Sequence, residues 1–388
     1  MRILITLTYY RPHYSGLTIY TERLARGLAE RGHQVTVITS RFLPSLPPCE
    51  IKDGVEVIRP WVLLRISKGV IMPAMIWHVW KKLRQVDVVN LQVPQLDAAP
   101  VAVLARLAGK PVVLTYHCDL RLPEGFIHWV ANQVSHVANH ISALAANVVV
   151  TNTRDYAENS PFLKRYLSKL VVIPPSIQLP AFTQEDVAAF RRKFAVRPEQ
   201  KIIGIVARLA TEKGVEYLVE ALPGVRKVYP EARVLFVGQY QDVMGEEQYA
   251  ARLAPLIDEL GPGHWTFLGI LDPMELAVFY HICAVTVLPS INRTESFGMV
   301  QIESMMCGTP VIATDLPGVR QPVLTTGMGK IVPMRDSRAL EAALIEALNN
   351  PGQFDGDTAA ISKRYSPQEI ASEYEELFRS LSQKHGLP

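Results

Sequence analysis

Two kinds of apolar pattern alternate along the chain. Short runs rich in Val, Ile and Leu, such as residues 35–39, are bounded by turn residues and are typical of buried strands. Longer segments between such runs carry apolar residues at helical spacing, as at Leu17, Tyr20, Leu24 and Leu28. A chain in which these strands and helices take turns predicts a parallel sheet with helices on both faces.

The alternation occurs in two series separated by a proline-rich segment. The first series has expected strands at residues 3–8, 35–39, 87–91, 111–115, 147–151 and 171–174. Three prolines within residues 173–180 then favour an extended course. The second series has expected strands at 201–207, 233–238, 265–269, 284–289 and 310–314, and helices at 214–228, 248–260, 273–281, 297–307 and 338–348.

The sequence therefore predicts an α/β protein with two Rossmann-like, doubly wound parallel-sheet domains whose edges face a shared cleft. We expect the first domain at residues 1–176 and the second at residues 177–365, followed by an amphipathic helix within residues 366–388. A length of 388 residues agrees with more than one domain, because single hydrophobic cores stop growing at about 250–300 residues.

Composition excludes several classes of protein. Hydrophobic residues make up 48% of the chain and charged residues 20%, which argues against a disordered or low-complexity protein. The net charge of +3 is too small for the electrostatic footprint of a nucleic-acid-binding protein. Four dispersed cysteines form no C-x-x-C pair, so a reducing compartment is expected.

Neither of the most apolar segments predicts export or a membrane span. Residues 1–8 are too short for a secretory signal and predict a strand. Residues 69–80 are shorter than the roughly 20 apolar residues of a spanning helix and contain Pro73. We therefore expect a cytoplasmic protein.

A glycine-containing turn follows the first expected strand and opens the first helix at Ser15-Gly16. Backbone N–H groups at a helix start favour an anion. The turn lacks both the G-x-G-x-x-G fingerprint and the P-loop pattern, so NAD and ATP chemistry lose support. A plain strand-to-helix connection remains an alternative for this turn taken alone.

Two cations follow the first strand of the second series. Arg208 and Lys213 lie five residues apart at the carboxyl end of that strand, where open parallel sheets bind ligands. Both side chains could reach one diphosphate. Two solvated surface charges are the alternative interpretation.

Two carboxylates surround an expected helix start in the second domain. Glu295 precedes the helix that we expect from Phe297, and Glu303 lies one and a half turns inside it. The amides of Ser296, Phe297, Gly298 and Met299 would then face an anion. Helix capping would explain Glu295 and leave Glu303 unexplained.

The spacing Glu295-x7-Glu303, followed by Cys307-Gly-Thr-Pro-Val-Ile-Ala-Thr, resembles the C-terminal half of the family 4 retaining glycosyltransferases (glycosyl transferases group 1), which have the GT-B fold. Other elements of this family match in order and spacing: Ser15-Gly16, the Arg31-Gly32-His33-Gln-Val turn, Tyr116-His117 and Arg208-x4-Lys213. The resemblance covers nearly the whole chain, and it implies that the last helix crosses back to the N-terminal domain.

The resemblance also implies roles for the matching residues. Arg208 and Lys213 would hold the donor diphosphate, and Glu303 would accept hydrogen bonds from the ribose hydroxyls. Glu295 and the amides of residues 296–299 would bind the sugar. Ser15 and Gly16 would also bind the donor. His117 would stand at the reaction centre, so that the catalytic set is His117, Arg208, Lys213 and Glu295. Fixed cations stabilise the charge that develops on a departing diphosphate, so we expect no metal and no cofactor beyond the nucleotide sugar.

An acid-free stretch at residues 57–86 carries basic and aromatic residues around an apolar stripe. Its cations are Arg59, Arg65, Lys68, Lys81, Lys82 and Arg84, and its tryptophans are Trp61, Trp77 and Trp80. This composition suits an anionic membrane surface. A buried helix with a snorkelling rim is the alternative.

We therefore expect a glycosyltransferase that moves a hexose from a UDP- or GDP-sugar to a hydroxyl with retention of configuration. A lipid-linked or membrane-associated glycan, in cell-envelope polysaccharide or glycolipid synthesis, is the expected acceptor. A peripheral position on the inner face of the cell membrane is left open. The alternatives are a sugar-nucleotide epimerase of the same architecture and a non-enzymatic two-domain protein that binds a small ligand.

Overall fold

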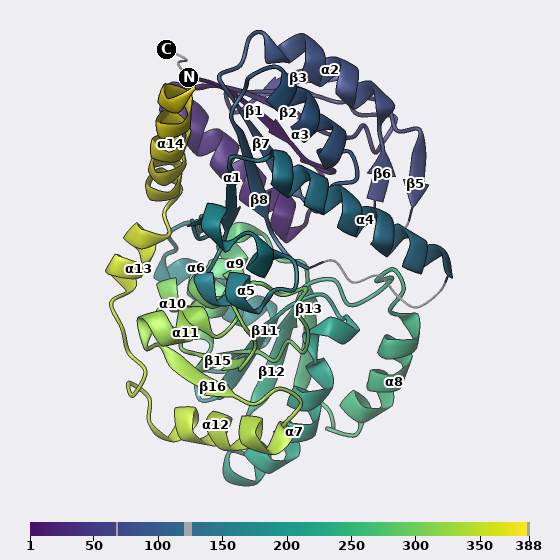
Figure 1. The fold of residues 1–388 in the computed structure, drawn as a ribbon. Coiled ribbons are helices and arrows are strands. Elements are labelled where there is room, and N and C mark those ends of the chain that lie inside the picture. The colour runs from purple at the N-terminus through teal and green to yellow at the C-terminus, as the bar shows by residue number, and fades with distance from the viewer. Residues whose placement is uncertain (67–68, 120–125, 386–388) are drawn as a thin grey trace. The chain divides into compact units, whose positions relative to one another are not determined.

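The computed structural model describes residues 1–66, 69–119 and 126–385, without the side chains of residues 66 and 126–131. The chain divides into two compact units (Figure 1). Unit 1 comprises Met1–Ser176 and Tyr365–Pro388, and unit 2 comprises Ile177–Arg364.

Unit 1 is built on an eight-stranded sheet with the order β10-β9-β8-β7-β1-β2-β4-β3. All neighbours are parallel except β3 and β4, which pair antiparallel. A separate hairpin is formed by β5 and β6. The strands are β1 (Arg2–Thr6), β2 (Gln34–Ile38), β3 (Cys49–Lys52), β4 (Val55–Ile58), β5 (Leu64–Ile66), β6 (Gly69–Ile71), β7 (Val88–Val93), β8 (Val112–Tyr116), β9 (Val148–Thr151) and β10 (Leu170–Val172).

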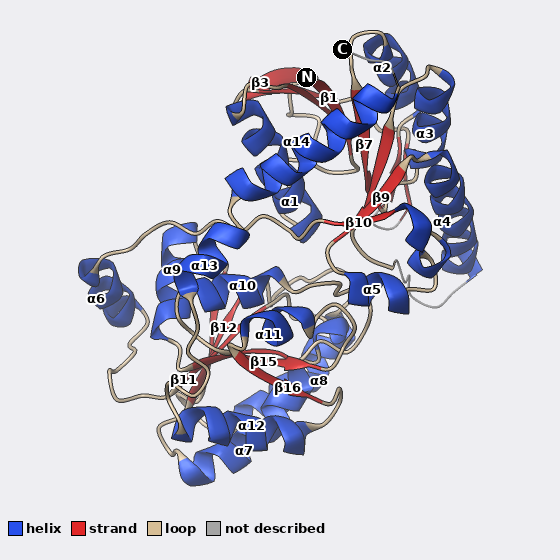
Figure 2. Ribbon diagram, turned by 60° about the vertical axis from the view of Figure 1, so that its left-hand side comes forward, coloured by secondary structure: helices blue, strands red, loops and turns tan. Residues whose placement is uncertain are grey.

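Helices cover both faces of this sheet (Figure 2). One face packs against α2 (Pro73–Leu83), α3 (Ala98–Leu107) and α4 (Phe126–Ala145). The other face packs against α1 (Gly16–Glu30) and α14 (Pro367–Lys384). The last helix therefore belongs to unit 1 although unit 2 precedes it in the chain. The short helix α5 (Arg154–Asn159) follows β9.

Unit 2 has a six-stranded, fully parallel sheet with the order β13-β12-β11-β14-β15-β16. Its strands are β11 (Ile202–Val206), β12 (Arg233–Val237), β13 (Trp265–Gly269), β14 (Val285–Leu288), β15 (Val311–Thr314) and β16 (Gly329–Val332). Its helices are α6 (Gln184–Lys193), α7 (Val215–Val228), α8 (Glu247–Asp258), α9 (Pro273–Ile282), α10 (Met299–Met306), α11 (Gln321–Thr326), α12 (Ser337–Asn349) and α13 (Thr358–Arg364).

Side-chain caps fix several helix starts. Ser15 accepts a hydrogen bond from an amide of the first turn of α1, and Asp272 and Ser366 do the same for α9 and α14. In α9 and α14 a proline follows the cap, where its missing N–H costs nothing. These helices begin where the chain supplies a polar oxygen.

The predicted fold class, two Rossmann-like parallel-sheet units, is confirmed. The sequence missed β3 to β6, β16 and the helices α6, α11 and α13, which are short or lie at the edges. The helix expected from Phe297 begins at Met299, because Gly298 precedes it in the left-handed conformation. No helix among the described residues is long and apolar enough to cross a membrane.

Candidate active site

The strand order of unit 2 reverses between β11 and β14. From this central pair the chain proceeds outward to β12 and β13 on one side and to β15 and β16 on the other. In open parallel sheets ligands bind at such a reversal, beyond the carboxyl ends of the strands. The loop after β11 carries Arg208 and Lys213, and the loop after β14 carries Glu295.

The two loops are tied together through the backbone. The amide of Ile291 donates to the carbonyl of Glu212 at 3.0 Å. Gly214 adopts φ +62°, and a Cβ placed on it would lie 2.3 Å from the carbonyl oxygen of Pro289. Only glycine permits both this conformation and this approach. The loops after β11 and β14 therefore form one surface.

This surface brings two of the expected residues into direct contact. Lys213 Nζ lies 2.5 Å from Glu295 Oε2, and both side chains are four-fifths buried. Arg208 pairs with Glu212 at 3.0 Å and remains nearly half exposed. Glu295 therefore pairs with a lysine of the opposite loop.

Glu303 lies on α10 and is buried. Its Oε2 accepts a hydrogen bond of 3.0 Å from the hydroxyl of Tyr280 on α9. Burial and the Glu303 charge together hold the pKa of Tyr280 well above its usual value, and they raise the pKa of Cys307 to about 12. Glu303 is thus a buried acid on α10 whose carboxyl group accepts a hydrogen bond from Tyr280.

The start of α10 is shaped by Gly298 and Gln301. Gly298 has φ +77°, and a Cβ there would meet Leu288 at 2.4 Å. The fully buried amide of Gln301 donates to the carbonyls of Phe297 and Val319 at 2.9 and 2.8 Å. The segment before α10 is therefore held rigidly, with Ser296 and Phe297 buried and Met299 partly exposed.

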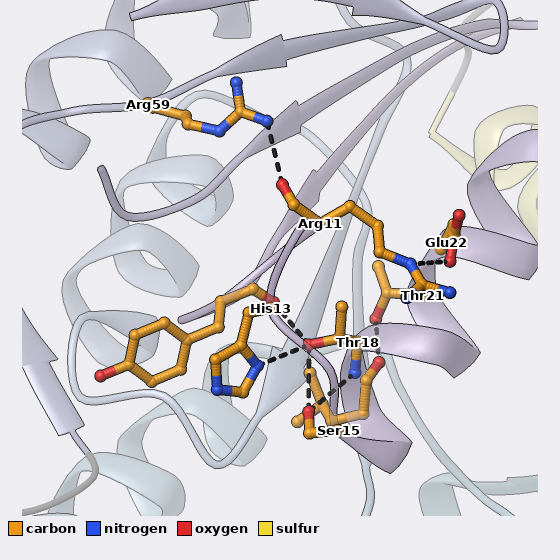
Figure 3. A network of polar contacts seen from close by, with 9 residues as sticks. Arg11, His13, Ser15, Thr18, Thr21, Glu22 and Arg59 are labelled. Carbon is orange, nitrogen blue, oxygen red and sulfur yellow. Dashed lines mark hydrogen bonds and ion pairs between the residues drawn. The ribbon is translucent and has the colours of Figure 1, made fainter. Parts of the chain in front are cut away.

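In unit 1 the corresponding strand-order reversal lies between β1 and β7. Ser15 caps α1 through a 3.2 Å bond from the Thr18 amide, and Gly16 is the first helical residue. Thr18 Oγ1 donates to the Tyr9 carbonyl at 3.1 Å and lies 3.4 Å from Nδ1 of His13 (Figure 3). Thr18 therefore links the loop at residues 9–15 to the first turn of α1.

Arg59 supports the same turn through a hydrogen bond to its backbone. Its guanidinium donates to the Arg11 carbonyl at 3.1 Å, while Arg11 itself pairs with Glu22 of α1 (Figure 3). Arg59 is 3% exposed and also pairs with Glu50. The prediction that Arg59 is one of the surface cations of residues 57–86 was therefore wrong, because its guanidinium is buried in unit 1 and pairs with Glu50 there.

His117 directly follows β8 and is buried. Its Nε2 lies 2.7 Å from the side-chain oxygen of Gln92, and the ring of Tyr20 meets it edge-on at 4.7 Å. Burial lowers the pKa of His117 to about 3. The imidazole is therefore neutral near pH 7.

Unit 1 thus holds Ser15, Gly16 and His117, and unit 2 holds the other eight expected site residues. Within the described ranges, no three His, Cys, Asp or Glu side chains gather as metal ligands would. Asp357, in the sequence Asp355-Gly-Asp357, accepts a hydrogen bond of 2.9 Å from the Ala360 amide and caps α13.

Sequence reasoning missed several residues that shape the site. Gln301 and Gly298 pin the start of α10, and Arg59 supports the turn before α1. Gln92, which contacts His117, had a signal in the sequence. Asn90 lies inside the buried strand expected at residues 87–91, and Gln92 directly follows that strand. Both alternate with apolar residues, and a buried polar side chain needs a specific partner.

Residues 57–86 divide between core and surface. Met75, Val79 and Leu83 of α2 are buried against the sheet, whereas Trp77 and Trp80 are each about half exposed. Of the basic residues, Lys82 pairs with Glu56 at 2.6 Å, and Lys81 lies 3.5 Å from the ring centre of Trp77. Lys68 lies outside the described residues.

Comparisons with known proteins match both units. The glycosyl transferases group 1 family matches residues 186–369, and the glycosyl transferase 4-like domain matches residues 15–176. The alpha-monoglucosyldiacylglycerol synthase of Acholeplasma laidlawii is 26% identical over 99% of this chain and 98% of its own. A D-inositol 3-phosphate glycosyltransferase of Thermobispora bispora is 29% identical over 87% and 83%.

A solved structure gives the same fold. The structure of Anabaena HepE in complex with UDP-glucose covers 98% of this chain and 100% of its own, with a TM-score of 0.74 at 19% identity.

Proposed function

Because the chain belongs to the family 4 glycosyltransferases of the GT-B fold, we propose that it transfers a hexose from a nucleoside-diphosphate sugar to a hydroxyl acceptor and retains the anomeric configuration. Membership of this family makes the chain a glycosyl-transferring enzyme, so the epimerase and the non-enzymatic binding protein fall away as alternatives. The observation that carries the proposal is the joined surface of Arg208, Lys213 and Glu295 at the strand-order reversal of unit 2.

The charges on this surface suit a nucleotide diphosphate. Arg208 and Lys213 each hold one carboxylate, so a diphosphate would compete with groups of the same charge for preformed cation positions. The first amides of α10 add the positive end of a helix dipole. HepE binds UDP-glucose on the same fold, which supports a nucleotide sugar as donor.

We propose the remaining roles from the position of each group. Glu303 is a buried carboxyl group on α10 and would accept hydrogen bonds from the ribose hydroxyls. When the diphosphate binds Lys213, Glu295 would lose its ion pair with this lysine. Its carboxylate would then accept hydrogen bonds from the sugar hydroxyls. Ser296, Phe297, Gly298 and Met299 would contribute backbone amides, and Ser15 and Gly16 the start of α1.

In the reaction, the bond between the anomeric carbon and the diphosphate oxygen breaks, and its electron pair stays on the diphosphate. A new bond forms from the acceptor oxygen to the same carbon, and the acceptor hydroxyl gives its proton to the diphosphate oxygen that leaves. Arg208 and Lys213 stabilise the charge that grows on the leaving group. His117, neutral at pH 7, would contact the bound substrates from unit 1.

The same two cations make a divalent ion unnecessary in this scheme, because they and the α10 start neutralise the diphosphate. Activity should therefore persist in EDTA. A complete loss of turnover that added Mg²⁺ or Mn²⁺ restores would overturn this part of the proposal.

The acceptor is proposed to be lipid-linked and reached from an anionic membrane surface. The helices α2, α3 and α4 contain no Asp or Glu, whereas α1 and α14 on the opposite sheet face carry six. The acid-free side exposes large apolar residues on each helix: Trp77, Trp80, Leu107, Val134, Val137 and Leu144. A face of this composition suits insertion between anionic lipid headgroups.

The two relatives differ on this point. The Acholeplasma laidlawii protein is named for a glucosylated diacylglycerol, which supports a lipid acceptor. The Thermobispora bispora protein is named for inositol phosphate, a soluble acceptor.

Release of free nucleoside diphosphate tests the proposed reaction. Purified protein is incubated with UDP- and GDP-hexoses, with and without diacylglycerol or a lipid-linked glycan in mixed micelles. We expect nucleoside diphosphate to appear faster when the acceptor is present, and the product to keep the donor's anomeric configuration in its NMR coupling constants. Inversion would refute retention, and epimerised donor without acceptor would refute transfer.

A further inference from the structure

Two polar side chains lie in the middle of the unit 1 sheet. Asn90 and Gln92 on β7 are fully buried, and they lie on one face because side chains alternate along a strand. Their neighbour across β8 is Thr115, which is 1% exposed and pairs with Gln92 in the strand register. Buried polar groups of this kind are costly unless each has a partner.

Each of these groups has a partner, and together they lead to His117. The oxygen of the Gln92 amide lies 2.7 Å from His117 Nε2, and its nitrogen donates to the Asn90 side-chain oxygen. The Asn90 nitrogen donates to Thr115 Oγ1 at 2.9 Å and to the carbonyl oxygen of Val113 at 3.4 Å.

The direction of this chain is set at its far end. A backbone carbonyl only accepts, so the Asn90 atom facing Val113 is its nitrogen, and the Asn90 oxygen faces Gln92. Gln92 must then present its nitrogen to Asn90 and its oxygen to His117. An oxygen that only accepts requires a proton on His117 Nε2.

Buried side chains of α1 and α14 pack around the amides of Asn90 and Gln92. Thr115 Oγ1 also lies 3.1 Å from the hydroxyl of Tyr374 on α14, which is 2.7 Å from the hydroxyl of Tyr20 on α1. The Tyr20 ring in turn packs edge-on against His117. The amide chain is therefore enclosed by the sheet on one side and by α1 and α14 on the other.

From this geometry we propose that Gln92 is a positioning residue, which holds His117 in the tautomer protonated on Nε2 and leaves Nδ1 as the hydrogen-bond acceptor for a hydroxyl of the bound substrates. This rests on the proposed function, in which His117 contacts those substrates. Asn90 acts one step further out, because it fixes the orientation of the Gln92 amide. Burial keeps the ring neutral by lowering the pKa of His117.

The tautomer is measured without substrate, by long-range ¹H–¹⁵N NMR on protein labelled at its ten histidines. A His117→Gln variant identifies the His117 signals by their loss. In the wild type we expect the protonated, pyrrole-type signal at Nε2 and the unprotonated, pyridine-type signal at Nδ1. The reverse pattern would overturn the inference whatever the enzyme's activity.

Three variants connect the tautomer to turnover. Gln92→Leu removes the acceptor, and we expect mixed tautomers and a drop of roughly tenfold to a hundredfold in kcat, as when partners that orient functional histidines are removed. Gln92→Glu keeps an oxygen on Nε2 but loses the donor to the Asn90 oxygen, so the wild-type tautomer should return with only part of kcat. Gln95→Leu is the matched control, because Gln95 is also a buried amide of unit 1, with hydrogen bonds to Thr6 and Met75.

The outcomes separate the inference from the proposed function. A folded Gln92→Leu protein with unchanged His117 signals and unchanged kcat would refute the inference. Equal losses of kcat in Gln92→Leu and Gln95→Leu would also refute it, because they would reflect general destabilisation. If the wild type transfers no sugar, the proposed function fails, while the NMR result still decides the tautomer.

Discussion

At the scale of single residues, the proposed diphosphate site depends on Arg208 and on the ion pair of Lys213 with Glu295. Replacing Arg208 or Lys213 by Ala should lower kcat by about 10²–10³, because the variant lacks a cation that stabilises the negative charge developing on the leaving diphosphate. The control is Lys193→Ala, which breaks an ion pair with Glu275 at the surface of the same unit. Steady-state kinetics check this, and wild-type kcat/KM in Arg208→Ala or Lys213→Ala would contradict the assignment.

The two glutamates should divide the donor between them. Glu303→Gln keeps an oxygen for the Tyr280 hydroxyl but removes the charge, so free nucleoside diphosphate and intact donor should both bind roughly tenfold more weakly. Glu295→Gln should weaken the intact donor more than the free diphosphate, since its proposed partner is the sugar. Calorimetry with both ligands measures this, and equal losses in both variants would contradict the division.

The buried His117 should make stability depend on pH. Its pKa is about 3 in the folded protein against about 6.5 in the unfolded chain, so between these values only the unfolded state takes up the proton. Stability should therefore fall as pH falls through this window. His117→Gln lacks this contribution, so between pH 7 and pH 5 the wild type should lose about 2 kcal/mol more in urea unfolding than the variant. Parallel losses would argue against a neutral buried imidazole.

At the scale of elements, α2 shows how core and surface are divided on one helix. Lys81 lies on α2, and Arg84 directly follows it. Lys82 forms an ion pair with Glu56. The double variant Lys81→Glu, Arg84→Glu should weaken binding to vesicles containing phosphatidylglycerol by about fivefold or more for each residue at low salt, since each cation near an anionic surface adds about 1 kcal/mol. High salt should reduce this difference.

Co-sedimentation checks the α2 prediction, with Arg192→Glu, Lys227→Glu as a control of equal charge change on exposed residues of unit 2. A wild type that ignores anionic vesicles would favour a soluble acceptor.

The strands were predictable because burial on both faces leaves nearly continuous apolar runs, as in residues 35–39. The neighbourhood of the β11 and β14 loops was predictable too, because carboxyl ends of parallel strands share one edge. The direct contact of Lys213 with Glu295 was not, since it depends on how closely Gly214 approaches Pro289. Arg59 was misjudged for a related reason, because its partners Glu50 and Arg11 are joined to it only by the fold.

At the scale of the whole molecule, unit 1 depends on a helix that the chain supplies last. Ile370, Tyr374 and Phe378 of α14 are buried in the same core as α1. A Cβ on Gly27 of α1 would lie 3.1 Å from both the Ala371 Cβ and the Pro367 carbonyl oxygen. Gly27 therefore sets how closely the two helices pack.

Gly27→Val should overpack this contact and cost about 1–3 kcal/mol of unit 1 stability. Thermal unfolding and limited proteolysis after residue 364 measure the effect, and α14 should become cleavable first. Glu30→Val, which places the same β-branched residue at the exposed end of α1, is the control. A Gly27→Val protein as stable and as resistant as the control would show that α14 is not held by this contact.

The return of the chain to unit 1 also has a consequence for biosynthesis. A ribosome adds about 5–20 residues per second, so α14 is made on the order of ten seconds or more after β10, once all of unit 2 has been translated. Until then the apolar side of α1 lacks its cover, whereas unit 2 is contiguous and can fold as soon as it leaves the exit tunnel. The N-terminal half of this protein is therefore the last to be completed, and a nascent chain stalled before residue 365 would present exposed apolar surface to chaperones.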